Sequence, residues 1–310
     1  AKPENVSGHC KTTLNKKQKK FNILNNKEMK SIKDNIHIFI IMTVINFAVL
    51  WNYISNGKTL HGIGYFIFFY VAILIIHFFT NKIQPKNEIE VKEPKKELIT
   101  AIIFSVLGLL FLTLNYMLKS KTLPETMFIK IPISIGNLLF AIPLGLLIYL
   151  LVKRYKLLKL GFTIKPVYSI FLGIIIWGLT GVFAYFFNKE GMYWEKLYID
   201  DGVIGGIITI VTQGIIGAAL FEEFSRFIIQ SRFERVFKIN GLNILFATTI
   251  WAFMHFPVTY NKTGDAIGVF FYCIQIIPIG FIWGYLTQRT KSIVPSTITH
   301  GMNLWGFQNG

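Results

Sequence analysis

Long apolar runs separated by short polar connectors make up the chain from about residue 36 onward. The runs do not alternate apolar and polar residues, and most approach the ~20 residues that a helix needs to cross a bilayer. Nine segments can be marked, with approximate limits 36–54, 60–79, 98–117, 132–152, 168–187, 203–223, 242–260, 266–286 and 293–308. The pattern predicts an all-α, polytopic integral membrane helical bundle of eight or nine transmembrane helices, because the ninth segment is short and the seventh contains polar residues.

The first 35 residues differ from the rest, with nine lysines and little apolar periodicity before Phe21. Such a composition buries too little apolar surface to fold alone, so we expect a polar cytosolic arm over 1–35. About 35 polar residues before the first apolar run also argue against a cleavable signal peptide. The expected organisation is this arm, N-terminal transmembrane helices over 36–187 and a transmembrane core over 203–308.

Basic residues are distributed unequally between the two sets of connectors. Twenty-five of the 32 lysines and arginines lie in the arm and in alternate connectors, namely 80–97, 153–167, 224–241 and 287–292. Cytosolic loops carry the excess of lysine and arginine, so the asymmetry predicts a multi-pass protein of the cell membrane with a cytosolic N-terminus. The net charge of +16 is then explained by topology and by contact with anionic lipids, and nucleic acid is not an expected partner.

Composition narrows the function further. The chain is 53% hydrophobic and only 15% charged, which fits a membrane protein better than a soluble domain. Cys10 lies in the arm and Cys273 in an apolar run, and no CxxC or Cys/His metal spacing is present. A disulfide or a redox function is therefore not expected.

Two connectors have simple explanations. Asn81–Glu97 alternates lysine and glutamate around Pro85 and Pro94, which predicts a solvated cytosolic loop. The connector 188–202 combines acidic residues with aromatic residues typical of a membrane interface. Its pair Asp200 and Asp201 lacks an intramembrane GxGD context and is a weak candidate for catalysis.

The strongest candidate chemistry lies where Glu222, Glu223 and Arg226 follow the uncharged run Val203–Phe221. On a helix Arg226 is four residues from Glu222 and three from Glu223, so it can pair with either. Charges at membrane depth are costly, so such a cluster indicates a functional site by default. The alternative is that the carboxylates only mark the end of a span at the lipid headgroups.

Two later segments add polar groups to apolar runs. His255 lies in the seventh segment, and His300 with Asn303 in the ninth, whereas three other histidines lie near span ends where they can reach the interface: His37, His61 and His77. A carboxylate base, an imidazole that helps to activate water and donors for a developing oxyanion are what amide hydrolysis needs. Because His300 and Asn303 are three residues apart, they face the same way on a helix.

Three motifs carry a resemblance to a known family. Phe221-Glu-Glu-Phe-Ser-Arg226, Trp251-Ala-Phe-Met-His255, and the stretch from Gly284 through Arg289, Ser292 and His300 to Asn303 resemble the ordered motifs of the CPBP family. This family comprises the type II CAAX prenyl endopeptidases and bacterial relatives linked to abortive infection and bacteriocin immunity. The resemblance covers about residues 203–308.

The resemblance implies an all-helical intramembrane protease. Glu222 would be the water-activating base, assisted by His255. Glu223 and Arg226 would form a structural ion pair. His300 would stabilise the oxyanion with help from a nearby asparagine.

The sequence departs from the family pattern at three places. Arginine follows the two glutamates after two residues instead of three, which leaves open which glutamate is the base. Trp251 stands where phenylalanine is usual, a change that keeps an aromatic ring. Leu304 occupies the usual position of asparagine or aspartate, so Asn303 would serve from one residue earlier.

The sequence therefore predicts an intramembrane endopeptidase that uses a glutamate-activated water on a peptide bond of a membrane-associated substrate. Its partners would be the bilayer and a peptide or protein, prenylated or otherwise lipid-anchored in one version of the hypothesis. The alternative is a non-catalytic membrane peptide-binding or bacteriocin-immunity protein. A transporter is disfavoured, because no inverted repeat is visible and segments three to five carry no charge.

The same glutamates and histidines bear on whether the protein needs a metal. We expect no cofactor, although one glutamate and two histidines would also suit zinc. No HExxH motif places two histidines on one helix face.

Overall fold

The computed structural model describes residues 37–81, 89–164, 167–187, 202–239 and 241–304. The chain divides into two compact units, residues 1–43 and residues 44–310. Of the first unit only the residues from His37 onward, at the start of the helix His37–Ser55, are described. The predicted arm over 1–35 and the pair Asp200 and Asp201 lie outside the described residues.

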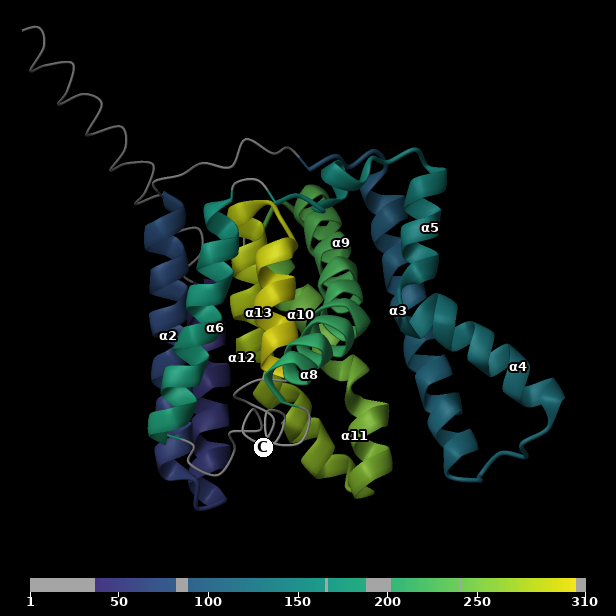
Figure 1. Cartoon of the computed structure of the whole chain (residues 1–310), viewed down its shortest axis with the longest axis horizontal. Coiled ribbons are helices and arrows are strands. Elements are labelled where there is room, and N and C mark those ends of the chain that lie inside the picture. The colour runs from purple at the N-terminus through teal and green to yellow at the C-terminus, as the bar shows by residue number, and fades with distance from the viewer. Residues whose placement is uncertain (1–36, 82–88, 165–166, 188–201, 240, 305–310) are drawn as a thin grey trace, which may run out of the picture. The chain divides into compact units, whose positions relative to one another are not determined.

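Every regular element in the described residues is helical, which confirms the all-α prediction (Figure 1). Seven of these helices are long and apolar enough to span a membrane: His37–Ser55, α2 (Thr59–Asn81), α3 (Pro94–Lys119), α6 (Tyr168–Phe187), Gly202–Phe237, Leu242–Thr263 and α12 (Ala266–Thr290). A bent pair of helices, Met127–Ala141 and Leu144–Val152, makes an eighth if it counts as one span. The described residues thus support the lower of the two predicted counts.

The predicted ninth segment corresponds to α13 (Val294–Leu304), which has 11 residues. That is about half of the ~20 residues that a span needs. Within the part of the chain that the structure describes, α13 is therefore a short helix of the core and not a ninth full span.

The predicted segment 132–152 is broken. It comprises α4 (Met127–Gly136), the π-helical turn η1 (Asn137–Ala141) and α5 (Leu144–Val152), with a bend of 64° between the two parts. Ile142, which precedes Pro143, is extended at φ −96° and ψ 116°. Proline disfavours the helical conformation in the residue before it, which explains the break.

The predicted connector 224–241 is wrong over most of its length. The helical run continues through α8 (Gly202–Thr209), the π-helical η3 (Ile210–Ala219) and α9 (Leu220–Phe237). Arg226 and Arg232 are both buried, and each is held in an ion pair. Two of the charges in this stretch are therefore neutralised inside the protein, whereas Arg235 and Lys238 stay exposed.

The predicted solvated loop Asn81–Glu97 needs a similar correction at its end. Pro94 begins α3, a position where proline is favoured because its missing N–H has no helical partner. Glu97 lies in the first turn and is only 1% exposed. Glu97 is therefore not solvated, whereas Lys95 and Lys96 before it are exposed.

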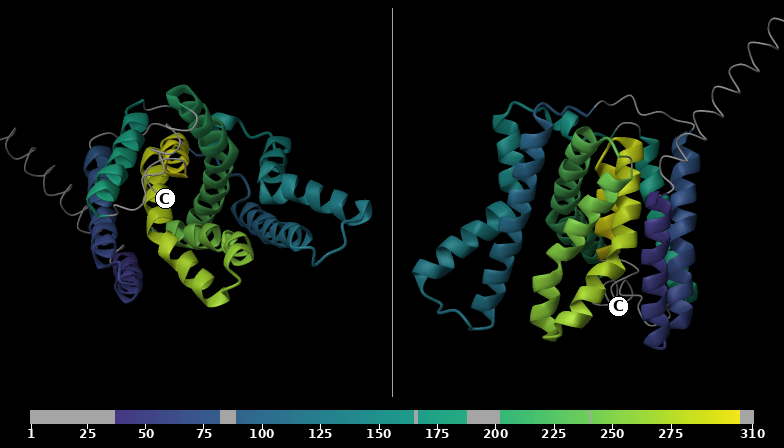
Figure 2. Two further views of the ribbon diagram at one scale, coloured as in Figure 1. Left: turned by 60° about the horizontal axis from the view of Figure 1, so that its bottom comes forward. Right: turned by 180° about the vertical axis from the view of Figure 1, so that it is seen from behind.

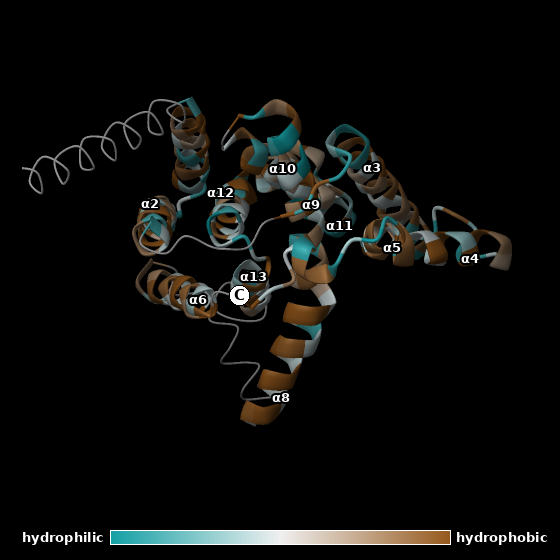
Figure 3. Cartoon of the chain, turned by 90° about the horizontal axis from the view of Figure 1, so that it is seen from above, coloured by the Kyte–Doolittle hydropathy of each residue, from teal (hydrophilic) through white to brown (hydrophobic). Residues whose placement is uncertain are grey.

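Within residues 44–310, α9 lies between two groups of helices. Figure 1 and Figure 2 both show α3, α4 and α5 on one side of α9, with α12 and α13 on the other. Figure 3, seen from above, shows the apolar α8 end of the same helical run lying away from these helices. The main core cluster is centred on α9, where Phe224, Phe227 and Ile228 pack against Leu98 of α3 and Leu146 of α5.

Two glycines allow α13 to approach its neighbours closely. A Cβ on Gly301 would lie 2.6 Å from the backbone of Ile215 in η3, and one on Gly173 of α6 would lie 2.7 Å from the carbonyl oxygen of Pro295. Small residues permit this backbone contact between membrane helices. The close packing fixes the height and rotation of α13 beside η3 and α6.

Candidate active site

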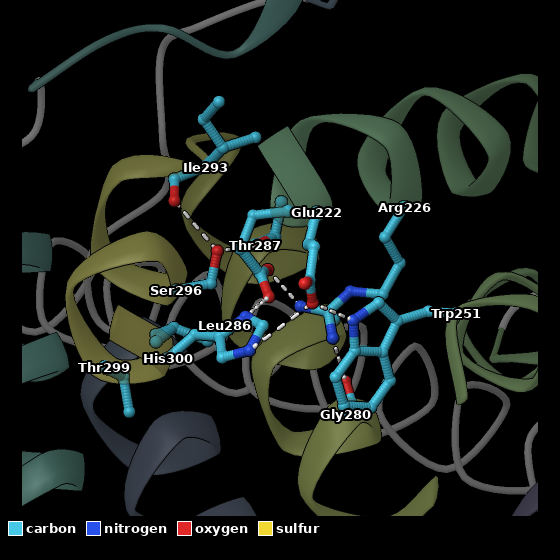
Figure 4. Close-up of polar contacts among 12 residues, drawn as sticks. Glu222, Arg226, Trp251, Gly280, Leu286, Thr287, Ile293, Ser296, Thr299 and His300 are labelled. Carbon is cyan, nitrogen blue, oxygen red and sulfur yellow. Dashed lines mark hydrogen bonds and ion pairs between the residues drawn. The ribbon is translucent and has the colours of Figure 1, made fainter. Parts of the chain in front are cut away.

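The predicted site residues come together from three elements: α9, the junction of α10 (Leu242–Met254) with α11 (Phe256–Thr263), and α13. The Oε2 atom of Glu222 lies 3.6 Å from Nε2 of His300 and 4.0 Å from Nε2 of His255. Figure 4 shows Glu222, Arg226, Trp251 and His300 pointing toward one another. Groups separated by 78 residues thus form one cluster around a single carboxylate.

Local hydrogen bonds set the position of α13. The Ser292 hydroxyl accepts from the backbone N–H of Val294 and donates to the carbonyl of Thr163, so it ties the start of α13 to the segment between η2 (Leu157–Leu160) and α6. Ser296 bonds Thr287 of α12 at 2.6 Å, and Thr299 donates to the carbonyl of Gly173 in α6. His300 is therefore held from two neighbouring helices.

Glu223 is the fully engaged carboxylate of the pair. Arg226 pairs with it across one helical turn and donates its other terminal nitrogen to the carbonyl of Gly280 at 2.9 Å. The second oxygen, Oε1, lies 2.9 Å from Nδ1 of His300. Glu223 and Arg226 are 1% and 2% exposed, so this pair is closed to solvent.

Glu222 has different surroundings. Its side chain is 33% exposed, and Trp251 donates its indole N–H to Oε2 at 2.5 Å. Trp251, His255 and His300 all approach this same oxygen, and among the described residues none is recorded as a partner of Oε1. One oxygen of Glu222 is thus held, and the other can meet a solvent molecule or a substrate.

Trp251 has a role that the sequence did not reveal. Its replacement of phenylalanine keeps a ring, as expected, but it also supplies the donor to Glu222. The signal that could have found this role is the polar N–H of an indole, which needs a partner when buried. Trp283, on α12, stacks on His300 with ring centroids 3.9 Å apart, and Arg226 lies 5.7 Å from the ring centroids of both tryptophans.

His255 and Asn303 complete the cluster. His255 ends α10, and its Nδ1 lies 3.0 Å from the carbonyl of Trp251, which assigns the proton to Nδ1 and leaves Nε2 facing Glu222. Asn303 accepts a hydrogen bond on Oδ1 from Thr180 of α6 at 3.0 Å. Its buried Nδ2 has no partner among the described residues. Thr180 carries no pattern that would have identified it in the sequence.

Two cavities meet at Trp251 and His255, which line both. We call the first the polar cavity; it measures about 300 Å³, and its lining includes Tyr65, Thr180, Gln275, His61, His300 and Asn303. The second, the apolar cavity, measures about 190 Å³ and lies between α3, η1 and α5 on one side and α9 to α11 on the other. Glu222 lines the apolar cavity, so the cluster lies where the two cavities meet.

The described residues contain no group of three or more His, Cys, Asp or Glu side chains placed to hold a metal ion. Glu222 Oε2 is already bonded to Trp251, and His300 Nδ1 to Glu223.

Residues 204–305 match the family model described as "Type II CAAX prenyl endopeptidase Rce1-like". The match confirms the recognised resemblance over this segment, which contains every predicted site residue. Searches among curated proteins and among solved structures found no match. The family and the apolar helices together support a protease activity in a multi-pass membrane protein.

Proposed function

We propose that this protein is an intramembrane endopeptidase that cleaves a peptide bond of a membrane-associated substrate with a water molecule activated by Glu222. One observation supports this most: of the two adjacent glutamates only Glu222 is open to a cavity, and two histidines lie within 4.0 Å of it. Both carboxylate oxygens of Glu223 already have partners, one in Arg226 and the other in His300. The shortened spacing between the glutamates and the arginine therefore favours Glu222 as the base.

Glu222 acts as the base through Oε1, the oxygen that has no partner among the described residues. Trp251 orients the carboxylate through Oε2, which directs Oε1 toward the attacking water. The 4.0 Å gap between His255 Nε2 and Glu222 is too long for a hydrogen bond and is the right size for a water bridge. Water attacks the carbonyl carbon as its proton passes to Glu222, and the same proton is then returned to the leaving amine as the C–N bond breaks.

The oxyanion is stabilised from the polar cavity. The Nδ1–H of His300 is bonded to Glu223, so this ring can reach the developing negative charge only from Nε2. The free Nδ2 of Asn303 supplies a second donor.

We propose that the reaction needs no metal; in support, no group of three or more His, Cys, Asp or Glu side chains among the described residues is placed to hold one. Cleavage should persist after dialysis against a strong chelator, and the purified active protein should hold less than one equivalent of zinc. Loss of cleavage on chelation with recovery on added zinc would contradict this.

We further propose that the N-terminus is cytosolic. Arg226 and Arg232 prove to be buried, but removing them from the count leaves the asymmetry of basic residues strong. Cysteines placed in 80–97 and 153–167 should react with a membrane-impermeant reagent from the cytosolic side, and cysteines in 188–202 from outside.

The proposed function is tested with purified protein in liposomes and a library of quenched fluorescent peptides. Glu222→Gln keeps the shape of the side chain but removes the proton acceptor, so cleavage should fall by ~10²–10⁴. Glu234→Gln, on the same helix outside the cluster, is the matched control and should cleave normally. Equal cleavage by Glu222→Gln and wild type would remove the protease proposal, and a peptide bound but never cleaved would favour a binding protein.

A further inference from the structure

The polar cavity lies toward one end of the helices that line it. Its lining residues on α2 fall in the first half of that helix, between His61 and Phe68, and those on α6 fall in the last half, between Thr180 and Phe187. Because α2 and α6 run in opposite directions, these two halves lie at the same end of the bundle, the lower end in Figure 1. We call this the cavity end and the opposite one the closed end.

The closed end is filled by buried side chains. Thr287 of α12 bonds Ser296 of α13 at 2.6 Å, and the hydroxyl of Ser292 donates to the carbonyl of Thr163. Thr287, Ser292 and Ser296 are each at most 2% exposed. On α9, which runs toward this end, every side chain from Arg226 to Phe233 is buried as well. The cluster is therefore shielded from the closed end by packed helices.

Exposure increases from the cluster toward the cavity end. His300 and Asn303 are 1% and 3% exposed, whereas Tyr272, which lines the same cavity from the first half of α12, is 39% exposed. Figure 3 shows that α8 lies away from the other helices, and its Val203 and Ile204 are exposed. A substrate therefore reaches the cluster from the cavity end.

The charges of the connecting stretches relate the two ends to the two sides of the membrane. The stretches that adjoin α2, α6 and α12 carry twelve lysines and arginines at the closed end and four at the cavity end. Those at the closed end are 80–97, 153–167 and 287–292, and those at the cavity end are 55–59, 188–202 and 261–265. Because cytosolic loops carry the excess of basic residues, this distribution supports a cytosolic closed end and an extracytoplasmic cavity end.

We propose that the substrate enters the site from the extracytoplasmic side, so that the protein cleaves membrane-anchored peptides at a bond in or next to the outer half of the bilayer. The inference rests on the proposed function and on the proposed orientation of the N-terminus. A peptide held only at the cytosolic leaflet is then not a substrate, because its scissile bond would have to pass the buried layer at the closed end. The hydrocarbon core is ~30 Å thick, so an anchored chain cannot present the same bond from either face.

The side from which the cavity is reached can be measured without turnover. Cys10→Ser and Cys273→Ala remove the native cysteines, and Ile279→Cys places one thiol in the polar cavity. Membrane vesicles of known orientation, right-side-out or inverted, are treated with a charged, membrane-impermeant thiosulfonate, which reacts with the thiolate. We expect modification to be at least tenfold faster from the extracytoplasmic side. Faster modification from the cytosolic side would overturn the proposal, whether or not any peptide is cleaved. If Ile279→Cys does not fold, Ile276→Cys in the same cavity wall takes its place.

Ala184 and Val182 on α6 form a matched pair that links entry to activity. Ala184 lines the polar cavity, whereas Val182 is 52% exposed and lines neither cavity. After labelling from the extracytoplasmic side, Ala184→Cys should cleave at least tenfold more slowly than before labelling, and Val182→Cys should stay within twofold. Equal losses in both variants would show that the label disturbs α6 in general, and would overturn entry through the cavity.

Cleavage by the wild type gives the direct test. A quenched fluorescent peptide with charged ends, chosen because the wild type cleaves it in detergent, is added outside vesicles of each orientation. Right-side-out vesicles should cleave it at least tenfold faster than inverted ones, and detergent should abolish the difference. Faster cleavage by inverted vesicles would overturn the proposal and leave the proposed function standing. A wild type that cleaves no peptide in detergent would contradict the proposed function, and the labelling of Ile279→Cys would still decide the side of entry.

Discussion

Helix α9 carries two buried guanidinium–carboxylate pairs that differ in what surrounds them. Arg226 pairs with Glu223 on the same helix, and Arg232 donates to Glu97 of α3 at 2.9 Å. Both arginines are almost fully buried. The chemistry of the two pairs is the same, so the pair itself cannot be what marks a catalytic site.

The second pair is closed by neutral partners. Tyr155 donates its hydroxyl to Oε1 of Glu97 at 2.5 Å, and the backbone N–H of Glu93 donates to the same oxygen. Burial, together with the bond to Glu97, raises the pKa of Tyr155 to about 12, so the phenol keeps its proton. Neither Glu97 nor Arg232 lines the polar or the apolar cavity. This pair joins α3 to α9 and has no access to a reacting group.

The first pair differs because a second carboxylate adjoins it. Glu222 lies on the same helix, at the wall of the apolar cavity, and its neighbours are Trp251 and the two histidines instead of an arginine. A buried ion pair is weak evidence of either stability or function. What distinguishes the site is the carboxylate that the pair does not neutralise.

Removing one arginine from each pair should have the largest effect on folding. Arg226→Ala and Arg232→Ala each leave a buried carboxylate without its guanidinium, and breaking such a pair costs about 3–5 kcal/mol. Folded yield and thermal unfolding in detergent should fall for both variants. The Arg232→Ala molecules that fold should retain cleavage per folded molecule, and a well-folded but inactive Arg232→Ala would contradict the assignment of this pair to structure alone.

Replacing both partners of a pair should separate function from folding. Arg232→Met with Glu97→Leu leaves no buried charge and should fold and cleave within about twofold of wild type. Arg226→Met with Glu223→Leu should also fold, but His300 loses the partner of its Nδ1, so cleavage should fall ~10²–10³ as when an oxyanion donor is lost. Equal activities of the two double variants would erase the distinction between the pairs.

The sequence predicted the membrane class and the site for a common physical reason. A bilayer requires long apolar helices, so the predicted limits 60–79 and 168–187 agree closely with α2 and α6. The same apolar background makes Glu222, His255 and His300 conspicuous. Few polar residues occur in these runs, so the ones that do occur indicate a common site.

The sequence did not predict features that depend on contacts between distant segments. Glu97 and Arg232 are 135 residues apart and both fall in predicted connectors, because a paired charge and a hydrated charge look alike in sequence. The hydrogen bond of Thr180 to Asn303 is equally non-local. The break at Pro143 is local and follows from the proline itself.

Trp251→Phe should have a smaller effect, confined to the first pair's neighbourhood. The variant keeps a ring beside His300 but removes the donor to Glu222, and a hydrogen bond to a charged group contributes ~1.5–3 kcal/mol. We expect kcat to fall about tenfold or more with folded yield unchanged. Trp283→Phe keeps a ring stacked on His300 and leaves the hydrogen bond to Glu222 intact, so its kcat should fall less than that of Trp251→Phe. The reverse order would indicate that ring packing, and not the indole N–H, matters.

The smallest effect belongs to the exposed ion pairs next to Glu97. Glu93 accepts hydrogen bonds from Lys96 and Lys153, both at 2.9 Å, and these lysines lower the pKa of its carboxyl from 4.5 to about 2. A depressed pKa means that the stabilisation is complete above the unfolded value and is lost as pH falls from about 4.5 toward about 2. Glu93→Gln should therefore lose that part of the acid dependence of the melting temperature, measured in detergent at several pH values.

Salt provides the control for this prediction. Because the ion pairs of Glu93 are exposed, ~1 M salt should reduce the difference in melting temperature between wild type and Glu93→Gln, whereas it should leave the buried pair of Glu97 and Arg232 unaffected. A difference that persists at high salt would show that Glu93 is coupled to the buried pair.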